Sequence, residues 1–260
     1  IREYRFDAEK GFFLNGKYRK LIGTSRHQDY KGMGNALRDE MHIRDVQLSK
    51  DMGSNFLRVA HYPQDPVVMQ MCDKLGLLTS VEIPVVNAIT QSKAFMDNCV
   101  EQVTEMVYQN YNYPSVIIWA YMNEVLLRPP FNPENRTERA DYMTFLHQIA
   151  SAVEAQIRSL DSERYTMLPC HSTSQIYQEA GIAELPMLLG FNLYNGWYGG
   201  SLSGFEEKLE ELHREFPHKP LLITEYGADV DTRIHSFRRC GLTLVVNLVP
   251  STTNITCLKF

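Results

Sequence analysis

Short runs of apolar, often β-branched residues alternate with longer amphipathic segments along most of the chain. Seven runs have the composition of buried strands: residues 19–24, 55–60, 77–83, 116–122, 165–171, 187–193 and 220–225. Six segments between them carry apolar residues at helical spacing: 39–52, 65–75, 93–111, 136–160, 174–179 and 204–216. Because strands that alternate with helices form parallel sheets, the pattern predicts an α/β fold, a (β/α)8 TIM barrel complete through strand seven.

The two ends of the chain depart from this alternation. Residues 1–18 contain an Asn-Gly pair between apolar residues, which predicts a short hairpin capping a barrel that spans residues 19–231. Residues 232–260 contain no Asp or Glu, although the rest of the chain is rich in both. We interpret 232–260 as an atypical tail that is foreign to the fold. The alternative is that the apolar run 242–249 serves as a substitute strand eight.

Composition narrows the class of protein. The chain has 260 residues, 44% hydrophobic and 22% charged, which suits one large globular domain. A net charge of -5 without a long basic run gives no reason to expect a nucleic-acid partner. No apolar run approaches the roughly 20 residues of a membrane span, so no membrane partner is expected. Five scattered cysteines without C-x-x-C spacing argue against a disulfide framework or a zinc site. The chain starts without Met in strand-like sequence, which indicates a fragment; the compartment stays open.

Two of the predicted strands end in a glutamate. The run 116–122 is followed by Asn123 and Glu124, and the run 220–225 ends in Glu225. Parallel strands of a barrel direct their C-terminal ends to the same face, so the two carboxylates should converge. Other polar and aromatic residues expected at strand ends are Arg26, His27, Asp29, Arg58, His61, Glu82, His171, Tyr194 and Trp197. Two carboxylates with hydrogen-bonding groups and a flat ring are typical of a carbohydrate site.

Four ordered motifs carry a family resemblance. They are Trp-Ala-Tyr-Met-Asn-Glu at 119–124, Thr-Glu-Tyr-Gly-Ala at 224–228, Arg-Val-Ala-His-Tyr-Pro at 58–63 and Gly-Phe-Phe-Leu-Asn-Gly-Lys at 11–17. Together they resemble the catalytic barrel of glycoside hydrolase family 2, the β-galactosidase and β-glucuronidase family. The similarity covers roughly residues 5 to 236. It implies a carbohydrate substrate and a retaining mechanism, with no cofactor.

The resemblance also implies roles for individual residues. Glu124 matches the general acid/base, which needs a raised pKa, and Glu225 matches the nucleophile, which must stay ionised. Such a pair is expected about 5–5.5 Å apart. The substrate-binding set is expected to be Asn123, His27, His61, Tyr194, Trp197 and Arg58. A β-galactoside is the favoured substrate, with glucuronides, mannosides and glucans as alternatives.

Each assignment has a purely structural alternative. A glutamate after a strand can pair with arginine, Arg58 can serve an ion pair, and the histidines or Trp197 can simply pack. Asp29 and Glu82 are equally well explained as partners of Arg26 or of the histidines. A metal site formed by His27, Asp29, His61, Glu82 and His171 is not expected, because metal-dependent barrel hydrolases start from a His-x-His motif on strand one. The chain could also be a catalytically impaired sugar-binding barrel, and an open barrel would expose apolar edges that favour self-association.

Overall fold

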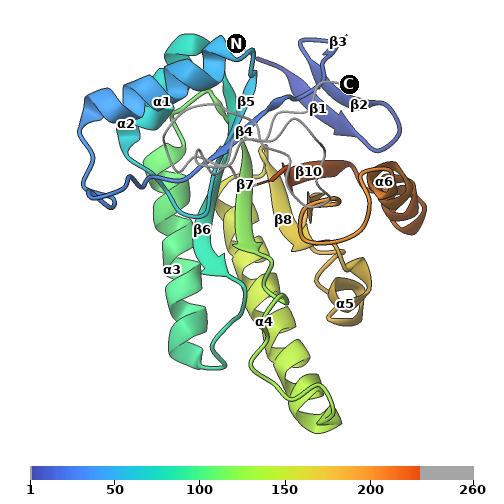
Figure 1. Cartoon of the computed structure of the whole chain (residues 1–260). Coiled ribbons are helices and arrows are strands. Elements are labelled where there is room, and N and C mark those ends of the chain that lie inside the picture. The colour runs from blue at the N-terminus through green and yellow to red at the C-terminus, as the bar shows by residue number, and fades with distance from the viewer. Residues whose placement is uncertain (1, 229–260) are drawn as a thin grey trace.

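Seven parallel strands form the central sheet of the computed structural model, which describes residues 2–228 (Figure 1). In sequence order they are β4 (Gly23–Arg26), β5 (Phe56–Val59), β6 (Leu78–Val86), β7 (Val116–Asn123), β8 (Tyr165–His171), β9 (Leu188–Leu193) and β10 (Leu221–Tyr226). Each strand pairs with its neighbour in the sequence, in the order β10-β9-β8-β7-β6-β5-β4. The predicted barrel is therefore confirmed through strand seven. The predicted tail, 232–260, lies outside the described residues.

Helices connect the strands, as the alternation predicts. They are α1 (Asp39–Asp51), α2 (Pro66–Leu75), α3 (Lys93–Asn110), α4 (Arg136–Leu160), α5 (Ser174–Glu179) and α6 (Gly204–Glu215). Helix α2 shows why these boundaries are readable from sequence: Asp65 caps its first turn by accepting from the backbone N–H of Val67, and Gly76 ends it in the left-handed conformation. Among the described residues, no helix combines the length and the apolar composition needed to cross a membrane.

Strand β7 is the centre of the core. All eight of its residues are buried, and Trp119 and Tyr121 are fully enclosed. The indole Nε1–H of Trp119 donates to Asp161, 3.0 Å away, so the one polar atom of that ring is satisfied. A strand held this firmly fixes the position of the residues at its C-terminal end, which are Asn123 and then Glu124.

A small antiparallel sheet precedes the barrel. It contains β1 (Tyr4–Asp7), β2 (Gly11–Leu14) and β3 (Lys17–Tyr18), so it has one strand more than the predicted hairpin. The Asn-Gly turn joins β2 to β3; the additional strand β1 pairs along the whole length of β2. The sheet meets the N-terminal ends of the barrel strands, where the Phe6 N–H donates to the Tyr165 hydroxyl across 3.2 Å.

The prediction for the first barrel strand is wrong by several residues. The strand was expected over 19–24 and followed by a polar loop, whereas β4 spans Gly23–Arg26. Arg26 is 1% exposed because its guanidinium pairs with Asp45 of α1 at 2.9 Å. A buried ion pair thus places in the strand a residue whose polarity suggested a loop. Asp29 and Glu82 were expected to pair with Arg26 or with the histidines. Arg26 pairs with Asp45 instead, whereas Glu82 does contact a histidine, His61, at 2.6 Å.

The first and last described strands approach each other. The Ser25 hydroxyl of β4 donates to the backbone carbonyl of Thr224 in β10 across 3.3 Å. Within the described part of the chain, β4 and β10 each pair on one side only. A cavity of about 520 Å³ lies beside them, lined in part by Phe56, Phe205 and Leu209. The seven strands therefore curve into a nearly closed barrel.

Candidate active site

The C-terminal ends of the barrel strands bring most of the predicted site residues together. Arg58, Glu82, Asn123 and Glu225 come from strands β5, β6, β7 and β10, while His27, His61, Glu124 and Tyr194 follow β4, β5, β7 and β9. Hydrogen bonds, ion pairs or a ring contact join these eight residues in one network, which Glu124 enters through Asn192. Parallel strand direction is what produces this convergence.

The carboxylate of Glu225 is held at both oxygens. Arg58 Nη1 donates to Oε1 across 2.5 Å, and the Tyr194 hydroxyl donates to Oε2 across 2.7 Å. The Glu225 side chain keeps 13% of its surface exposed. Donation to both oxygens favours the ionised carboxylate and fixes its orientation. Burial, together with the charge of Glu225, raises the pKa of the Tyr194 hydroxyl, which stays a proton donor.

Arg58 contacts several of the polar side chains of the site. The residue is 2% exposed, and besides Glu225 its Nη2 contacts Asn123 Oδ1 at 2.8 Å and both oxygens of Glu82 at 3.1 Å. Burial alone would lower the pKa of the Arg58 guanidinium, but Glu82 and Glu225 raise it above its ordinary value. One buried cation therefore serves two carboxylates, which is the condition under which such charges are tolerated in a protein interior.

Glu124 has a different environment. Its pKa is raised, chiefly by burial and further by the charge of Glu225, while a hydrogen bond from Asn192 acts in the opposite direction. Its backbone adopts φ 48°, a left-handed conformation that is uncommon outside glycine, and its N–H donates to the carbonyl of Pro169 at 2.9 Å. Strained backbone of this kind concentrates at functional sites. The strand end thus turns sharply and presents the carboxyl group towards the site.

Two histidines lie beside Glu225. His61 Nδ1 is 2.6 Å from Glu82 Oε1, and His61 Nε2 is 3.5 Å from Glu225 Oε1. The His27 ring stands edge-on to His61 with ring centroids 4.9 Å apart. Burial and the neighbouring His61 lower the pKa of His27. The neutral form of His27 is therefore favoured, as suits a hydrogen-bonding partner of sugar hydroxyls.

The loop after β9 carries aromatic side chains. The Tyr194 ring stands edge-on to Tyr198 at 5.2 Å, and the Tyr198 ring lies 6.1 Å from Trp197. Trp197 is half-buried, whereas Tyr198 is 77% exposed. Because Tyr194 contacts Glu225, these rings adjoin the paired carboxylates. An aromatic wall beside carboxylates suits the apolar face of a sugar ring.

Two members of the predicted strand-end set serve the fold instead. Arg26 points to α1, as described above. The His171 ring accepts or donates a 2.6 Å hydrogen bond with the Tyr177 hydroxyl, and burial lowers its pKa. Within residues 2–228, no group of three or more His, Cys, Asp or Glu side chains is arranged to hold a metal ion.

Asn192 is a site residue that the sequence argument missed. Its Nδ2 donates to Glu124 Oε1 at 3.0 Å and to Asn123 Oδ1 at 3.2 Å, while its Oδ1 accepts from the Thr224 hydroxyl at 2.7 Å. Asn192 therefore links the two glutamate-bearing strands. One signal was available: Asn192 is a lone amide in the apolar run 187–193, and a polar residue in a buried strand usually has a specific partner.

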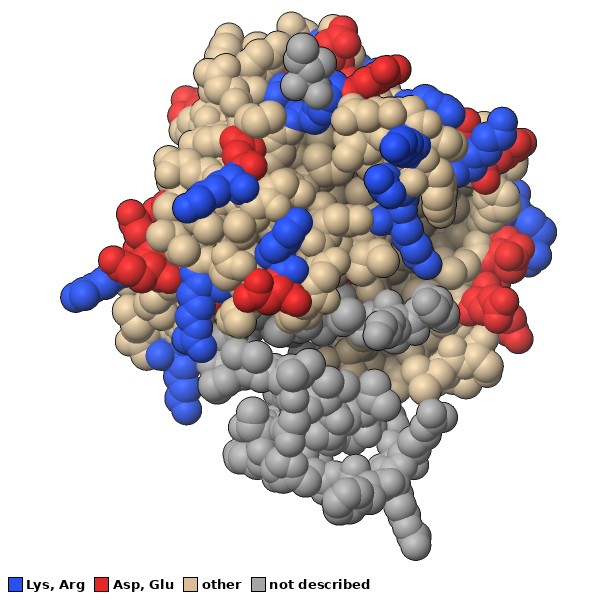
Figure 2. Space-filling model, turned by 90° about the horizontal axis from the view of Figure 1, so that it is seen from above, with Lys and Arg blue, Asp and Glu red and all other residues tan. Residues whose placement is uncertain are grey.

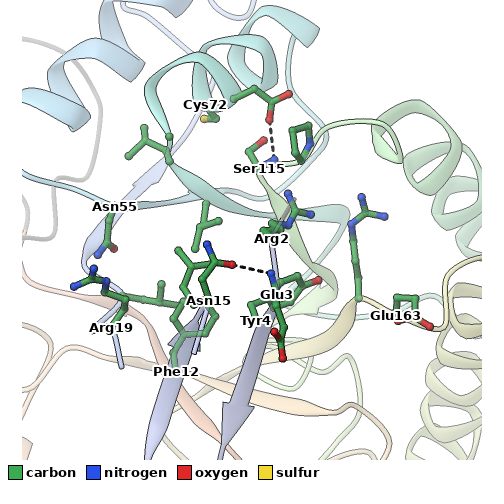
Figure 3. Close-up of a pocket in the computed structure, with 18 of the residues that line it drawn as sticks. Arg2, Glu3, Tyr4, Phe12, Asn15, Arg19, Asn55, Cys72, Ser115 and Glu163 are labelled. Carbon is green, nitrogen blue, oxygen red and sulfur yellow. Dashed lines mark hydrogen bonds between the residues drawn. The ribbon is translucent and has the colours of Figure 1, made fainter. Parts of the chain in front are cut away.

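A second cavity, of about 920 Å³, lies at the opposite end of the barrel (Figure 3). It is lined by residues of the small sheet and by strand beginnings, including Arg2, Asn15 and Ser115. Its polar groups serve the fold: Asp73 accepts from the Ser115 N–H at 2.7 Å, and Asn15 accepts from the Glu3 N–H at 2.9 Å. None of the predicted site residues lines it.

The molecular face at this end carries mixed charge. Figure 2 shows lysine and arginine side chains next to aspartate and glutamate side chains around a largely uncharged surface. An anionic polymer would meet carboxylates as well as cations on this face.

Comparison with known proteins gives a consistent result. A family model described as "Glycosyl hydrolases family 2, TIM barrel domain" matches residues 7–237. The chain is 34% identical to a β-glucuronidase of Bacteroides fragilis over 88% of its length, and 24% identical to the β-galactosidase BoGH2A of Bacteroides ovatus over 90%. The crystal structure of a Bacteroides uniformis β-glucuronidase superposes with a TM-score of 0.88 and 43% identity over 92% of the chain.

These relatives are longer proteins. The chain spans 31% of the Bacteroides fragilis β-glucuronidase, 29% of BoGH2A and 28% of the Bacteroides uniformis structure. The matched part is the barrel that carries the paired glutamates.

Proposed function

Because the chain belongs to family 2 of the glycosyl hydrolases, we propose that it is the catalytic barrel of a retaining β-glycosidase, with Glu124 as general acid/base and Glu225 as nucleophile. Its substrate would be a carbohydrate with a terminal β-linked sugar. The chain needs no cofactor for this chemistry, since two carboxyl groups suffice.

The observation that carries the proposal is the contrast between the two glutamates. Glu225 receives a hydrogen bond at each oxygen, one of them from the Arg58 cation, and such donation stabilises a carboxylate. Glu124 is half-buried, receives one donor and has a raised pKa. Two carboxyl groups with such different surroundings are suited to opposite roles.

The mechanism follows from these roles. Glu225 attacks the anomeric carbon, and the bond from that carbon to the leaving oxygen breaks as Glu124 donates its proton to that oxygen. Glu124, now ionised, takes a proton from water, and the resulting hydroxide displaces Glu225 from the glycosyl-enzyme. The sugar leaves with its original anomeric configuration, and both carboxyl groups return to their starting protonation states.

Asn123 is suited to read the 2-hydroxyl. Its Oδ1 accepts from Arg58 and from Asn192, which fixes the orientation of the amide. The Nδ2 group is then left as the donor that can face a sugar hydroxyl. We assign His27 and His61 to the remaining hydroxyls and Trp197 to the wall beside the sugar ring, with Tyr194 and Arg58 orienting Glu225.

Relatives favour a β-glucuronide over the β-galactoside that the motifs alone suggested. Most of the similar proteins are named β-glucuronidases, including those of Bacteroides fragilis and Streptococcus agalactiae. BoGH2A keeps a galactoside as the second candidate. By the family resemblance, the cationic clamp for a glucuronate carboxylate lies beyond strand seven, outside the described residues.

Hydrolysis of nitrophenyl β-glycosides tests the proposal. The panel contains the β-glucuronide, β-galactoside, β-mannoside and β-glucoside, and the glucuronide is expected to react fastest. Glu225→Gln should lower turnover by at least about 10³-fold, whereas Glu101→Gln, on the exposed side of α3, should leave it unchanged. Activity that survives Glu225→Gln does not come from this site. Sugar binding without turnover in the unmodified chain would favour an impaired sugar-binding barrel.

A further inference from the structure

Glu82 is a buried carboxylate that the mechanism above does not use. It lies on β6, is 1% exposed and faces two cation-forming groups, the Arg58 guanidinium and the His61 ring. Burial alone would raise its pKa, but Arg58 and His61 together lower it below the ordinary value. The carboxylate is therefore ionised and, at 1% exposure, too enclosed to contact a sugar.

The two partners of Glu82 are also the partners of Glu225. Arg58 Nη2 contacts both oxygens of Glu82 at 3.1 Å, while Arg58 Nη1 contacts Glu225 Oε1 at 2.5 Å. His61 Nδ1 is 2.6 Å from Glu82 Oε1, and its Nε2 is 3.5 Å from Glu225 Oε1. Each partner thus bridges from the enclosed carboxylate to the proposed nucleophile through different nitrogens.

We propose that Glu82 is a positioning residue, which acts on the nucleophile Glu225 through Arg58 and His61. The inference rests on the proposed function, since it takes Glu225 to be the nucleophile. The carboxylate next to His61 Nδ1 favours a proton on that nitrogen, and the contact holds the ring in the orientation in which Nε2 faces Glu225. The same carboxylate partly compensates the positive charge of Arg58.

The charge on Arg58 matters because Glu225 loses its own charge during the reaction. When Glu225 bonds to the anomeric carbon it becomes a neutral ester, and Arg58 loses one of its two anionic partners. Glu82 remains, so the buried guanidinium stays compensated in the glycosyl-enzyme. Without Glu82, the preference of Arg58 for the free Glu225 carboxylate over the ester would be larger than it is with Glu82 present. Glycosylation would therefore slow.

Within residues 2–228, titratable groups face Glu225 from four neighbouring parts of the barrel. Arg58 and His61 come from β5 and the loop after it, His27 follows β4, Glu124 follows β7 and Tyr194 follows β9. Of these groups in the described part of the chain, Glu82 contacts Arg58 and His61, so its replacement acts on the surroundings of Glu225 through these two residues.

The test is the pair Glu82→Gln and Glu82→Asp, measured on the full chain with the nitrophenyl glycoside that reacts fastest. Glu82→Gln should lower kcat roughly 10- to 100-fold with less than about a 3-fold change in KM. The acidic limb of the kcat/KM profile should move to lower pH, because Arg58 then holds the Glu225 carboxylate more strongly. Glu82→Asp keeps the charge and should leave the limb in place while recovering part of kcat.

Asp45→Asn is the matched control. Asp45 is also a buried carboxylate that pairs with an arginine of the barrel, but its partner Arg26 points to α1. That variant should lower the melting temperature without moving the acidic limb. If both Glu82 variants lower the melting temperature as Asp45→Asn does and leave kcat and the limb unchanged, Glu82 is a structural partner only. If Glu82→Gln does not fold, the test rests on Glu82→Asp. The proposal is contradicted if that variant folds, keeps its kcat and has a shifted acidic limb of the kcat/KM profile.

The failure of the proposed function is a separate result. It would appear as glycosidase activity that survives Glu225→Gln, or as an unmodified chain without turnover. The positioning role alone fails when the unmodified chain is active and Glu225→Gln is inactive, but the Glu82 variants leave kcat and the acidic limb unchanged.

Discussion

Asn192 of β9 donates a 3.0 Å hydrogen bond to Oε1 of Glu124, which follows β7, two strands away in the sheet. A carbonyl oxygen accepts better than a carboxylic hydroxyl oxygen, so this bond favours Oε2 as the site of the proton that Glu124 donates. The bond also favours the ionised carboxyl, so it opposes the burial that raises the pKa of Glu124. The proton affinity of the proposed acid/base is therefore set by two competing and separable effects.

Replacement of Asn192 should raise the pKa of Glu124 further. In Asn192→Ala the donor is lost while burial and the charge of Glu225 remain. The general acid then keeps its proton to higher pH, so the basic limb of the kcat/KM profile should move to higher pH. Asn110→Ala, which removes another buried asparagine on α3, should reduce stability without moving that limb. A basic limb that moves to lower pH in Asn192→Ala would contradict the assigned role.

Tyr194→Phe should weaken the hold on the nucleophile. The variant removes the 2.7 Å hydrogen bond to Glu225 Oε2 and little else. Hydrogen bonds to charged groups contribute about 1.5–3 kcal/mol, so kcat/KM should fall roughly 10- to 150-fold. Steady-state kinetics measures the loss. Tyr165→Phe is the control, since that hydroxyl bonds to the small sheet at the other end of the barrel; equal losses in both variants would point to a general effect of hydroxyl removal.

Gly190→Ala should displace the strand that carries Glu225. An added Cβ would lie 2.5 Å from Thr224 Cγ2 and 3.3 Å from Pro169 Cα, so Thr224 must shift. Thr224 bonds to Asn192 and precedes Glu225, and we expect a loss of about 1–3 kcal/mol in the free energy of unfolding with a fall in kcat. Gly199→Ala, where an added Cβ meets nothing within 4 Å, is the matched control. Urea denaturation and turnover of both variants decide the point.

The sequence predicts the barrel and the convergence of the two glutamates because both follow from repeated local patterns. Strand β8 and helices α4 and α5 begin and end where periodicity placed them. The first barrel strand does not, because the Arg26–Asp45 pair that buries it joins residues 19 positions apart. The Glu82–His61 contact was among the expected alternatives. The role of Asn192 and the Glu82–Arg58 contact were missed, because a partner on another strand leaves no periodic signal.

The tail is the part of the prediction that the described residues do not reach. If residues 232–260 are foreign to the fold, Val246→Pro should leave the melting temperature unchanged. If the segment is instead a strand between β10 and β4, the proline removes a ladder hydrogen bond and the melting temperature should fall. Thermal unfolding of this variant separates the two interpretations. Size-exclusion chromatography over a range of concentrations tests the related proposal that open barrel edges promote self-association.

Asp161 should make the stability of the barrel depend on pH. Burial alone would raise its pKa, but donation from Arg164, from Trp119 and from the backbone N–H groups of Arg164 and Glu163 lowers it below its usual value. A carboxyl group with a lowered pKa in the folded state contributes stability that is complete above its unfolded pKa and is lost as the pH falls through the folded value.

Asp161→Asn removes this contribution. The variant should lose about 1.5–3 kcal/mol in the free energy of unfolding at pH 7, because the ionised acceptor of Trp119 and Arg164 is gone. The difference from the unmodified chain should shrink once the pH falls below about 3.8, because Asp161 then binds a proton in the unfolded chain but not yet in the folded one. Thermal unfolding at a series of pH values measures it, with Asp141→Asn on the exposed side of α4 as the control. A difference that grows as the pH falls would show that Asp161 is not stabilised as an anion.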